Sequence, residues 1–436
     1  MEEEIAQVPR FGARASLENL GGYLEKLGHP EKELRVIHVA GTNGKGSVCS
    51  YIDSILREAG FKTALFTSPH LQEVRERFRI DGRLCSYEKT LEAYRKVRNL
   101  MDEGALESLM PLTYFEILFL MSLLIFREEK PDYCIMETGL GGRLDATVLT
   151  EPVLCVITSI SIDHSQVLGD TIEKIAAEKA GIIKEGIPVV TIDEGTAATS
   201  VIRKEADRNR ADLIVINTRE LRFLKKSVKS IDFSIDCRYY KSDRLSINSK
   251  ADYQVYNAAL AVLSVRRLLR DSTIGEARLE EAIRSGLLKM SWEGRMEEIF
   301  PDVYVDGAHN VGAVRQVCRQ LERELAEGSS YVLVFAVCQD KDYSGMISLL
   351  AGISFEKIFI TRIRGIRGAD VEEVRDLFTA ACECPTETCS NVQEAMEKAL
   401  SYKDTCRNED LKVLCLGSLY MVGEIKDLAA KKERIK

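Results

Sequence analysis

The chain has 436 residues, 45% of them hydrophobic and 29% charged, and a formal net charge of −8. This length predicts two or three domains of an ordinary globular protein, and the acidic balance argues against a nucleic-acid partner, which would need surplus lysine and arginine. The start lacks the pattern of a secretory signal and the most apolar stretch, 117–126, is too short to cross a bilayer, so we expect a cytoplasmic protein without membrane partners.

Strand and helix patterns alternate from residue 34 onward. LRVIHVAG reads as a buried strand, VCSYIDSILREAG as a helix ending at Gly60, and KTALFTS as a second strand. Further buried strands are predicted at 132–138, 154–160 and 187–192, with helices between them. This alternation predicts a mainly parallel sheet covered by helices on both faces. Residues 213–250 are more polar and β-like, and we expect a small antiparallel sheet there.

The second half of the chain starts a new βα series. Helices are predicted at about 253–269 and 276–288, followed by strands DVYVDG, YVLVFAV, EKIFITRI and LKVLCLG. We place the domain boundary within 290–299, which predicts a first α/β domain at 1–292 and a smaller Rossmann-like α/β domain at 293–436. The 12 cysteines are scattered. Cys382, Cys384 and Cys389 lie close together without a nearby histidine, which favours plain thiols over a zinc site.

The segment HVAGTNGKGS at 38–47 differs in two ways from the phosphate-loop pattern G-x-x-x-x-G-K-[ST]. Val39 replaces the first glycine, and Gly46 follows Lys45 where a hydroxyl would bind magnesium. Backbone N–H groups of such a loop, at a helix N-terminus, bind phosphate oxygens, and a lysine reaches the β- and γ-phosphates. The alternative is a glycine-rich turn with an exposed lysine. The strand–loop–helix order favours a nucleotide site.

Polar side chains follow the later strands of this first domain. Glu137 ends one strand and precedes a glycine turn with Arg143 and Asp145, and His164 lies just beyond another strand. A carboxylate there suits Mg²⁺, although a loop-capping glutamate and a structural histidine remain alternatives. Lys179 lies on a predicted helix, where a solvated surface lysine is the simpler interpretation.

Several segments occur together in one order: HVAGTNGKGS, TSPHLQEVRERFRIDG, LTYFEILF, METGLGGRLDAT, SIDHSQVLGDTIEKIAAEKAGIIK, WEGRME, DGAHN and LGSLYMVGEI. Together they resemble the folylpolyglutamate synthase/dihydrofolate synthase family of the Mur ligase superfamily. The resemblance runs from about residue 17 to about 425. It implies a phosphate-loop domain of the Mur ligase type followed by the Rossmann-like domain.

The resemblance also implies a set of nucleotide and metal residues. Lys179 matches a lysine that takes up CO₂ to become a carbamate, which turns a cation into an anionic oxygen ligand. Metal ligands for two Mg²⁺ sites would be Ser68, Glu137, His164 and carbamylated Lys179. ATP would be bound by Thr42, Asn43, Gly44, Lys45, Gly46, Ser47, Asn257, Arg295, Asp306 and His309. Lys45, Lys179, His164 and His309 are the residues expected to serve catalysis.

The substrate side is less closely matched. The resemblance places Thr113, Phe115, Glu116, Arg143 and Asp145 near the pterin end, while Phe115 reads equally well as core. Val148 stands where the family has asparagine, Val311 where it has proline, and Ala336 where it commonly has glycine. The first departure weakens expectations of substrate contacts near residue 147.

The implied reaction is ATP-dependent ligation of L-glutamate to folates, and to 7,8-dihydropteroate, through an acyl phosphate. A Mur ligase acting on a UDP-muramyl peptide is the main alternative, but about 37 residues before the loop are too few for the extra N-terminal domain those enzymes carry. A nucleotide-dependent switch is a weaker alternative, because no N-K-x-D guanine-reading motif occurs. We expect a monomer acting on small molecules. The sequence leaves open whether one or both activities are present, which folate form is preferred, and the glutamate chain length.

Overall fold

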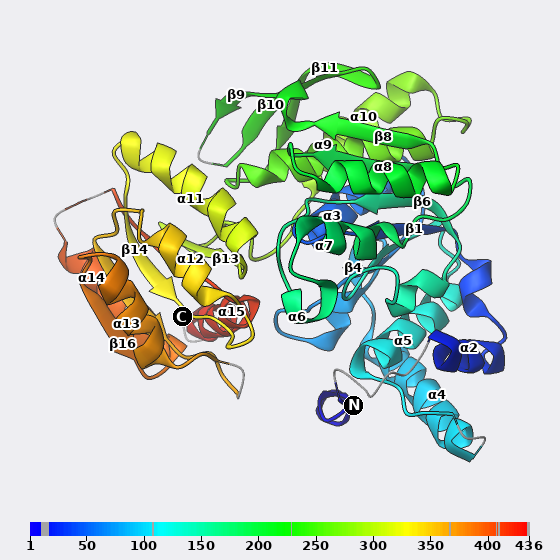
Figure 1. Cartoon of the computed structure of the whole chain (residues 1–436), viewed down its shortest axis with the longest axis horizontal. Coiled ribbons are helices and arrows are strands. Elements are labelled where there is room, and N and C mark those ends of the chain that lie inside the picture. The colour runs from blue at the N-terminus through cyan, green and yellow to red at the C-terminus, as the bar shows by residue number, and fades with distance from the viewer. Residues whose placement is uncertain are drawn as a thin grey trace.

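The computed structural model describes residues 1–9, 17–106, 109–227, 229–365, 368–406, 408 and 410–433. Two α/β domains lie side by side, each built around its own sheet (Figure 1). We call them the central domain, around an eight-stranded sheet, and the C-terminal domain, around a six-stranded sheet. This arrangement confirms the α/β class predicted from the sequence.

The central sheet has the order β4-β3-β2-β5-β1-β6-β7-β8, and only β3 and β4 run antiparallel to their neighbours. The chain's first strand, β1, lies between β5 and β6, so the strand order reverses on either side of it. Ligands of such sheets bind beyond the carboxyl ends of the strands at this point. The strands are β1 (Val36–Ala40), β2 (Thr63–Phe66), β3 (Phe78–Ile80), β4 (Arg83–Leu84), β5 (Tyr133–Glu137), β6 (Pro152–Ile157), β7 (Val189–Asp193) and β8 (Leu213–Asn217).

Helices cover both faces of this sheet. On one face α3 (Lys45–Glu58), α9 (Tyr253–Leu268) and α10 (Glu276–Lys289) pack together over a shared apolar core. Elsewhere α5 (Tyr114–Glu129) places the apolar stretch 117–126 fully in the core. The remaining helices of this domain are α1 (Glu2–Ala6), α2 (Leu17–Lys26), α4 (Tyr87–Leu106), α6 (Ser165–Leu168), α7 (Ile172–Ala180) and α8 (Ala198–Arg208). Within the described part of the chain, no helix is long and apolar enough to span a membrane.

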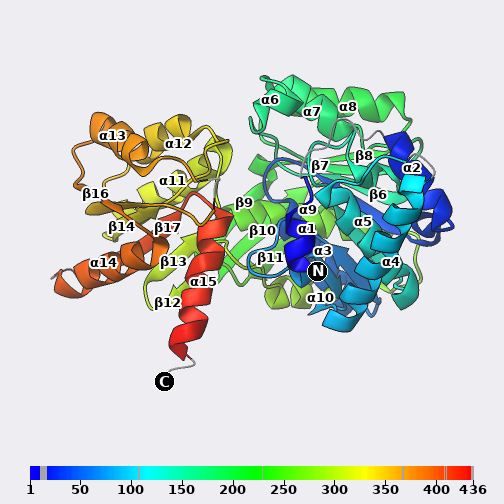
Figure 2. The same ribbon diagram turned by 90° about the horizontal axis from the view of Figure 1, so that it is seen from below.

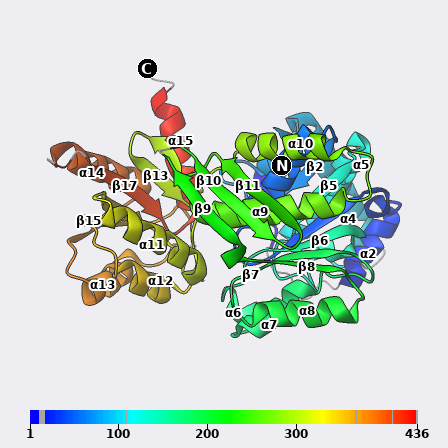
Figure 3. The ribbon, with the colours of Figure 1, turned by 90° about the horizontal axis from the view of Figure 1, so that it is seen from above.

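A three-stranded antiparallel sheet contacts α9 beside the junction of the two domains (Figure 3). Its strands are β9 (Leu221–Lys226), β10 (Ile231–Cys237) and β11 (Tyr240–Ile247). The expectation of an antiparallel sheet is right for these strands but wrong for 213–217, which form β8 of the central sheet. Strand β8 lies at the sheet edge, where alternating half-buried residues mimic an antiparallel strand.

The C-terminal sheet has the order β12-β13-β17-β14-β15-β16 and is parallel except for β12. The four strands predicted here are confirmed, and two edge strands are additional. The strands are β12 (Glu297–Phe300), β13 (Val303–Asp306), β14 (Ser330–Phe335), β15 (Lys357–Thr361), β16 (Thr386–Cys389) and β17 (Leu411–Leu416). The helices are α11 (Val311–Ala326), α12 (Tyr343–Leu350), α13 (Val371–Ala381), α14 (Val392–Thr405) and α15 (Leu419–Glu433).

Helix α15 lies on the side of the C-terminal domain that faces the central domain (Figure 2). Its Asp427 accepts a hydrogen bond from Gln72 of the central domain at 2.7 Å. Leu71 packs against the apolar cluster to which Met421 and Val422 of this helix belong. Cys382, Cys384 and Cys389 of the same domain form no disulfide bond, and among the described residues they belong to no group of three or more possible metal ligands.

A buried histidine on β1 makes stability depend on pH. His38 is fully buried, and its Nε2 lies 2.7 Å from the Thr147 hydroxyl, which itself donates to Asp145. Burial, together with nearby Lys184, lowers the pKa of His38 to about 3. The unfolded chain takes up this proton near pH 6.5, so His38 contributes stability above that pH and loses it as the pH falls.

We expect the free energy of unfolding to fall by about 2 kcal/mol between pH 7.5 and pH 5 through His38, since 1.5 pH units below 6.5 correspond to roughly 2 kcal/mol. Urea unfolding of wild type and of His38→Gln at both pH values measures the contribution of His38 to this decrease in stability. The variant should lack this part of the pH dependence. Equal pH dependence in both proteins would contradict the assignment.

Candidate active site

The loop after β1 makes a tight turn into α3 at Gly44 and Lys45. Gly44 has φ +84°, and a Cβ there would lie 2.3 Å from Oδ1 of Asn257 on α9. At Gly46 a Cβ would lie 2.8 Å from Cζ2 of Trp292, in the linker between the domains. The residue that departs from the usual phosphate loop is therefore a glycine because the indole of Trp292 occupies the space of a side chain.

A cavity of about 570 Å³ lies beyond the carboxyl ends of the central strands, between the two domains. The loop after β1, the end of β5 and the segments after β2 and β6 line it from the central domain, and the end of β13 with the segment after it lines it from the C-terminal domain. Every residue predicted to bind nucleotide or metal lines this cavity: Thr42, Asn43, Gly44, Lys45, Gly46, Ser47, Ser68, Glu137, His164, Lys179, Asn257, Arg295, Asp306 and His309.

Glu137, at the end of β5, is a buried carboxylate in the cavity wall. Its Oε2 accepts a hydrogen bond from the backbone N–H of Ser68 at 2.9 Å, and Oε1 lies 3.9 Å from Nζ of Lys45. Burial raises the pKa of Glu137 above its ordinary value, and Lys45 acts in the opposite direction. A cation beside this carboxylate therefore favours its charged form.

Lys179, in the last turn of α7, is only 4% exposed. Its Nζ donates to the backbone carbonyl of Gly41 at 2.6 Å, at the start of the phosphate loop. Burial, reinforced by Lys45, lowers the pKa of Lys179 to about 7. The structure thus excludes the alternative of a solvated surface lysine and leaves a large fraction of the amine uncharged near neutral pH.

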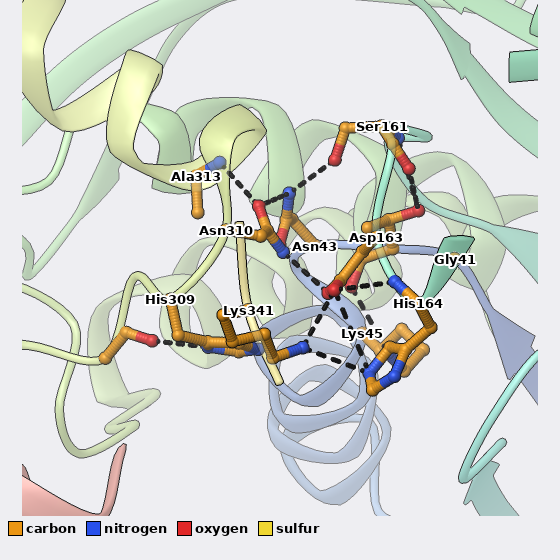
Figure 4. Close-up of polar contacts among 12 residues, drawn as sticks. Gly41, Asn43, Lys45, Ser161, Asp163, His164, His309, Asn310, Ala313 and Lys341 are labelled. Atoms are coloured by element: carbon orange, nitrogen blue, oxygen red, sulfur yellow. Dashed lines mark hydrogen bonds and ion pairs between the residues drawn. The ribbon is translucent and has the colours of Figure 1, made fainter. Parts of the chain in front are cut away.

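Polar contacts join the two domains across the cavity (Figure 4). The amides of Asn43 and Asn310 form a reciprocal pair, with Nδ2–Oδ1 distances of 3.2 and 2.9 Å. Asn310 also donates to Oδ2 of Asp163 at 2.9 Å, and Lys341 donates to Oδ1 of the same carboxylate at 2.8 Å. Burial raises the pKa of Asp163, but Lys341, through its charge and its hydrogen bond, acts together with His164 and His309 to hold this pKa below its ordinary value.

Asp306, at the end of β13, connects the linker and α9 to the C-terminal domain. Its carboxylate accepts hydrogen bonds from the backbone of Met296 at 2.9 Å and Ala308 at 2.8 Å, and from the Tyr253 hydroxyl. Two residues on, Nδ1 of His309 lies 2.7 Å from the Gly307 carbonyl. A carbonyl only accepts, so Nδ1 carries the proton and Nε2 is free to accept. Burial and Lys341 lower the pKa of His309 to about 4, so it is neutral at pH 7.

Comparison with known proteins agrees with this architecture. The family model described as the Mur ligase middle domain matches residues 39–265, and the model described as the Mur ligase, glutamate ligase domain matches 294–419. The chain is 35% identical over 423 residues to the dihydrofolate synthase/folylpolyglutamate synthase of Bacillus subtilis, covering 96% of this chain and 95% of the relative. The chain belongs to the folylpolyglutamate synthase/dihydrofolate synthase family.

Solved structures of this family share the fold over nearly the whole chain. The Mycobacterium tuberculosis folylpolyglutamate synthase complexed with ADP superposes with a TM-score of 0.87 at 27% identity, covering 98% of this chain and 97% of the other. Escherichia coli FolC in complex with DHPP and ADP gives 0.83 at 26% identity, with 99% and 97% covered. The bifunctional synthase of Yersinia pestis, complexed with AMPPNP and Mn ion, gives 0.83 at 26% identity, with 98% and 97% covered.

The five residues that the family resemblance assigns to substrate lie away from the cavity lining. Thr113 and Glu116 form a capping box at the start of α5, and Arg143 pairs with Glu178 at 2.7 Å. Asp145 is buried and accepts N–H bonds from Gly139 and Leu140. The Phe115 ring packs against Phe66, 5.7 Å between centroids, and against Gly139. Phe115 and Asp145 thus support residues 139–140, which do line the cavity, and the substrate roles stay predictions.

Several residues of the site have no role in the sequence-based predictions. Asp163 and Asn310 lie within the segments SIDHSQVLGDTIEKIAAEKAGIIK and DGAHN, and Lys341 lies just beyond YVLVFAV, but their mutual contacts were not predicted. Lys341 follows β14 at the edge of the C-terminal sheet where Asp306 ends β13. Charged residues just beyond the carboxyl ends of parallel strands are the signal that could have identified it.

Proposed function

We propose that this protein is an ATP-dependent ligase that joins L-glutamate to folates and to 7,8-dihydropteroate through an acyl phosphate, releasing ADP and phosphate. The observation that carries the proposal is the inter-domain cavity, lined by every expected nucleotide and metal residue in a chain 35% identical to a curated relative of this activity. Nucleotide complexes of the mycobacterial, E. coli and Yersinia proteins support the ATP requirement.

The phosphate loop would hold the ATP phosphates. The loop and the N-terminus of α3 line the cavity, where the first N–H groups of the helix would bind phosphate oxygens, and Lys45 adds a positive charge beside them. The Ser47 hydroxyl accepts a hydrogen bond from Gln254 at 3.1 Å and is 1% exposed, so it fixes α3 to α9. The nucleotide would also be contacted by Asn257 from α9, by Arg295 from the linker, and by Asp306 and His309 from the C-terminal domain.

The residues present fit a divalent metal that is shared with phosphate. Among the described residues, no three or more His, Cys, Asp or Glu side chains cluster as a complete metal site. Mg²⁺ commonly binds one or two carboxylates and completes its shell with water and substrate phosphates. Glu137 and Ser68 would hold one ion, and His164 with carbamylated Lys179 a second. Bound metal would neutralise charge on the transferring phosphoryl group.

Lys179 is suited to carbamate formation. An uncharged amine attacks CO₂, and burial leaves much of this amine uncharged near pH 7. The product is an anion with two oxygen ligands in place of an ammonium. The Gly41 carbonyl, 2.6 Å from Nζ, would hold the remaining N–H and orient the carbamate.

In the proposed reaction the folate carboxylate attacks the γ-phosphate in line, and the amine of L-glutamate then attacks the acyl carbonyl to form the amide. Lys45 and the loop N–H groups would stabilise charge on the phosphoryl oxygens. His309 would lie on the γ-phosphate side of the site when the domains are closed, and its Nε2 would donate to a phosphate oxygen only after taking up a proton. The pterin end of the site would be shaped by Thr113, Phe115, Glu116, Arg143 and Asp145.

We further propose that the chain forms two domains, at 1–292 and 293–436, and that the enzyme is a monomer.

Measurement of ADP release tests the function. We expect L-glutamate-dependent release with tetrahydrofolate, with 7,8-dihydropteroate, or with both, and none with a UDP-muramyl peptide acceptor. Release with only the UDP-muramyl acceptor would assign the chain to the other branch of the superfamily. A reaction without L-glutamate is the control for futile hydrolysis of ATP, and it should release no ADP.

A further inference from the structure

Lys341 lies in a buried bridge between the domains. It comes from the segment between β14 and α12 of the C-terminal domain, and its side chain is 9% exposed. Its Nζ donates to Oδ1 of Asp163 at 2.8 Å and lies 3.1 Å from Nε2 of His164 (Figure 4). One ammonium thus contacts two neighbouring residues of the central domain.

The contact with His164 fixes the state of its imidazole. An ammonium has only donors, so Nε2 of His164 accepts from Lys341 and the ring proton is on Nδ1. Asp163 is held at the same time, since it accepts from the backbone N–H of His164 at 2.9 Å and from Asn310 at 2.9 Å. Lys341 is therefore the cation that balances a buried carboxylate and occupies a histidine lone pair.

A neutral histidine binds a metal ion through the ring nitrogen that lacks the proton, which in His164 is Nε2. One lone pair cannot serve an ammonium at 3.1 Å and a divalent cation at the same time. We propose that Lys341 competes with the divalent metal for His164, so that the ammonium acts as an internal cation until metal displaces it. This inference rests on the metal role proposed above for His164.

The competition has a consequence for domain closure. Without Lys341, closing the domains around Asp163 would bury an unbalanced carboxylate, which is costly. Lys341 supplies the balancing charge in the closed arrangement, with its Nζ 2.8 Å from Oδ1 of Asp163. When metal displaces Lys341 from His164, the positive charge of Lys341 stays inside the closed site, next to the anionic substrates.

Binding of Mn²⁺ alone, followed by electron paramagnetic resonance of the free ion, tests the proposal on the full-length protein without nucleotide. Lys341→Met removes the ammonium and keeps the length of the side chain. We expect Mn²⁺ affinity to rise at least about tenfold in this variant, because the competitor is gone. Lys341→Arg keeps a donor-only cation and should stay within a few-fold of wild type.

A double-mutant cycle with His164→Ala separates direct competition from general electrostatics. The increase in Mn²⁺ affinity caused by Lys341→Met should disappear in the His164→Ala background. An increase that persists in that background would overturn the proposal. Equal Mn²⁺ affinity in wild type and Lys341→Met would also overturn the proposed competition. If His164→Ala then binds Mn²⁺ more weakly than wild type, the role of His164 as a metal ligand still holds. Mn²⁺ affinity insensitive to His164→Ala in both backgrounds would refute that metal role itself.

Lys341→Met leaves Asp163 without its cation, so folding of each variant is followed by thermal unfolding. The pair Asp163→Asn and Asp163→Asn/Lys341→Met lacks the buried carboxylate and provides a second comparison. The affinity for Mn²⁺ should again be higher in the variant without the ammonium. No difference within this pair would overturn the proposal.

Discussion

Lys179→Ala should lower kcat by about 100-fold or more, the loss typical of removing one preorganised charge from a transition state. The reason is that the proposed carbamate would be lost while Lys45 and the phosphate loop stay in place. Formate or acetate should restore part of the rate, because a small carboxylate can fill the space with an anionic oxygen. Steady-state ADP release with and without these anions measures both effects.

Lys174→Ala is the matched control for Lys179→Ala. Lys174 lies on the same helix, is exposed, and pairs with Asp170 at its surface. This variant should keep the wild-type rate and gain nothing from added carboxylates. A ¹³C resonance from labelled bicarbonate should appear in wild type and be lost only in Lys179→Ala. Wild-type turnover in Lys179→Ala would remove this residue from the site.

Gly46→Ala should reduce kcat/KM by about 10- to 100-fold. The new Cβ would lie 2.8 Å from the Trp292 ring, and overpacking of this kind costs roughly 1–3 kcal/mol. The indole cannot yield without moving the linker that carries Arg295 to the cavity. The chain contains one tryptophan, so a shift in its fluorescence reports displacement at this position alone.

Gly21→Ala is the control for Gly46→Ala. Gly21 also lies within a helix, α2, and a Cβ there meets nothing within 4 Å, so activity and fluorescence should be unchanged. In a Trp292→Ala background the space is open, and Gly46→Ala should then cost no further activity. A full additional loss in that background would show that the Trp292 contact is not the cause.

The central features of the site were predictable because they are local in the sequence. Lys45 comes after a buried strand and begins a helix, and Glu137 ends another strand, so parallel-strand geometry brings both to one edge. The reason for Gly46 was not predictable, since it depends on contact with a residue in the inter-domain linker. The bridge from Lys341 to Asp163 likewise depends on how two separately folded sheets are placed.

The edge strands show a second limit of sequence patterns. Strands β12 and β16 are half exposed along most of their length, so no apolar run marks them. Lys179 shows a third, because a lysine on a helix reads as a surface residue unless the neighbouring loop is known. Its burial comes from the Gly41 carbonyl and the cavity wall, which only the folded chain brings together.

The amide pair between the domains also bears on the chemical lifetime of the enzyme. Asn43 precedes Gly44, and asparagine before glycine is the sequence most prone to deamidation, since the following backbone nitrogen can attack the side-chain amide. In the closed arrangement both amide atoms of Asn43 are engaged by Asn310, and Nδ2 also donates to Ser161. Conversion to aspartate would place an acceptor against the Asn310 carbonyl and a second negative charge near Asp163. Closure of the domains therefore protects Asn43 from deamidation. Protein whose domains are kept open should accumulate a more acidic, inactive form.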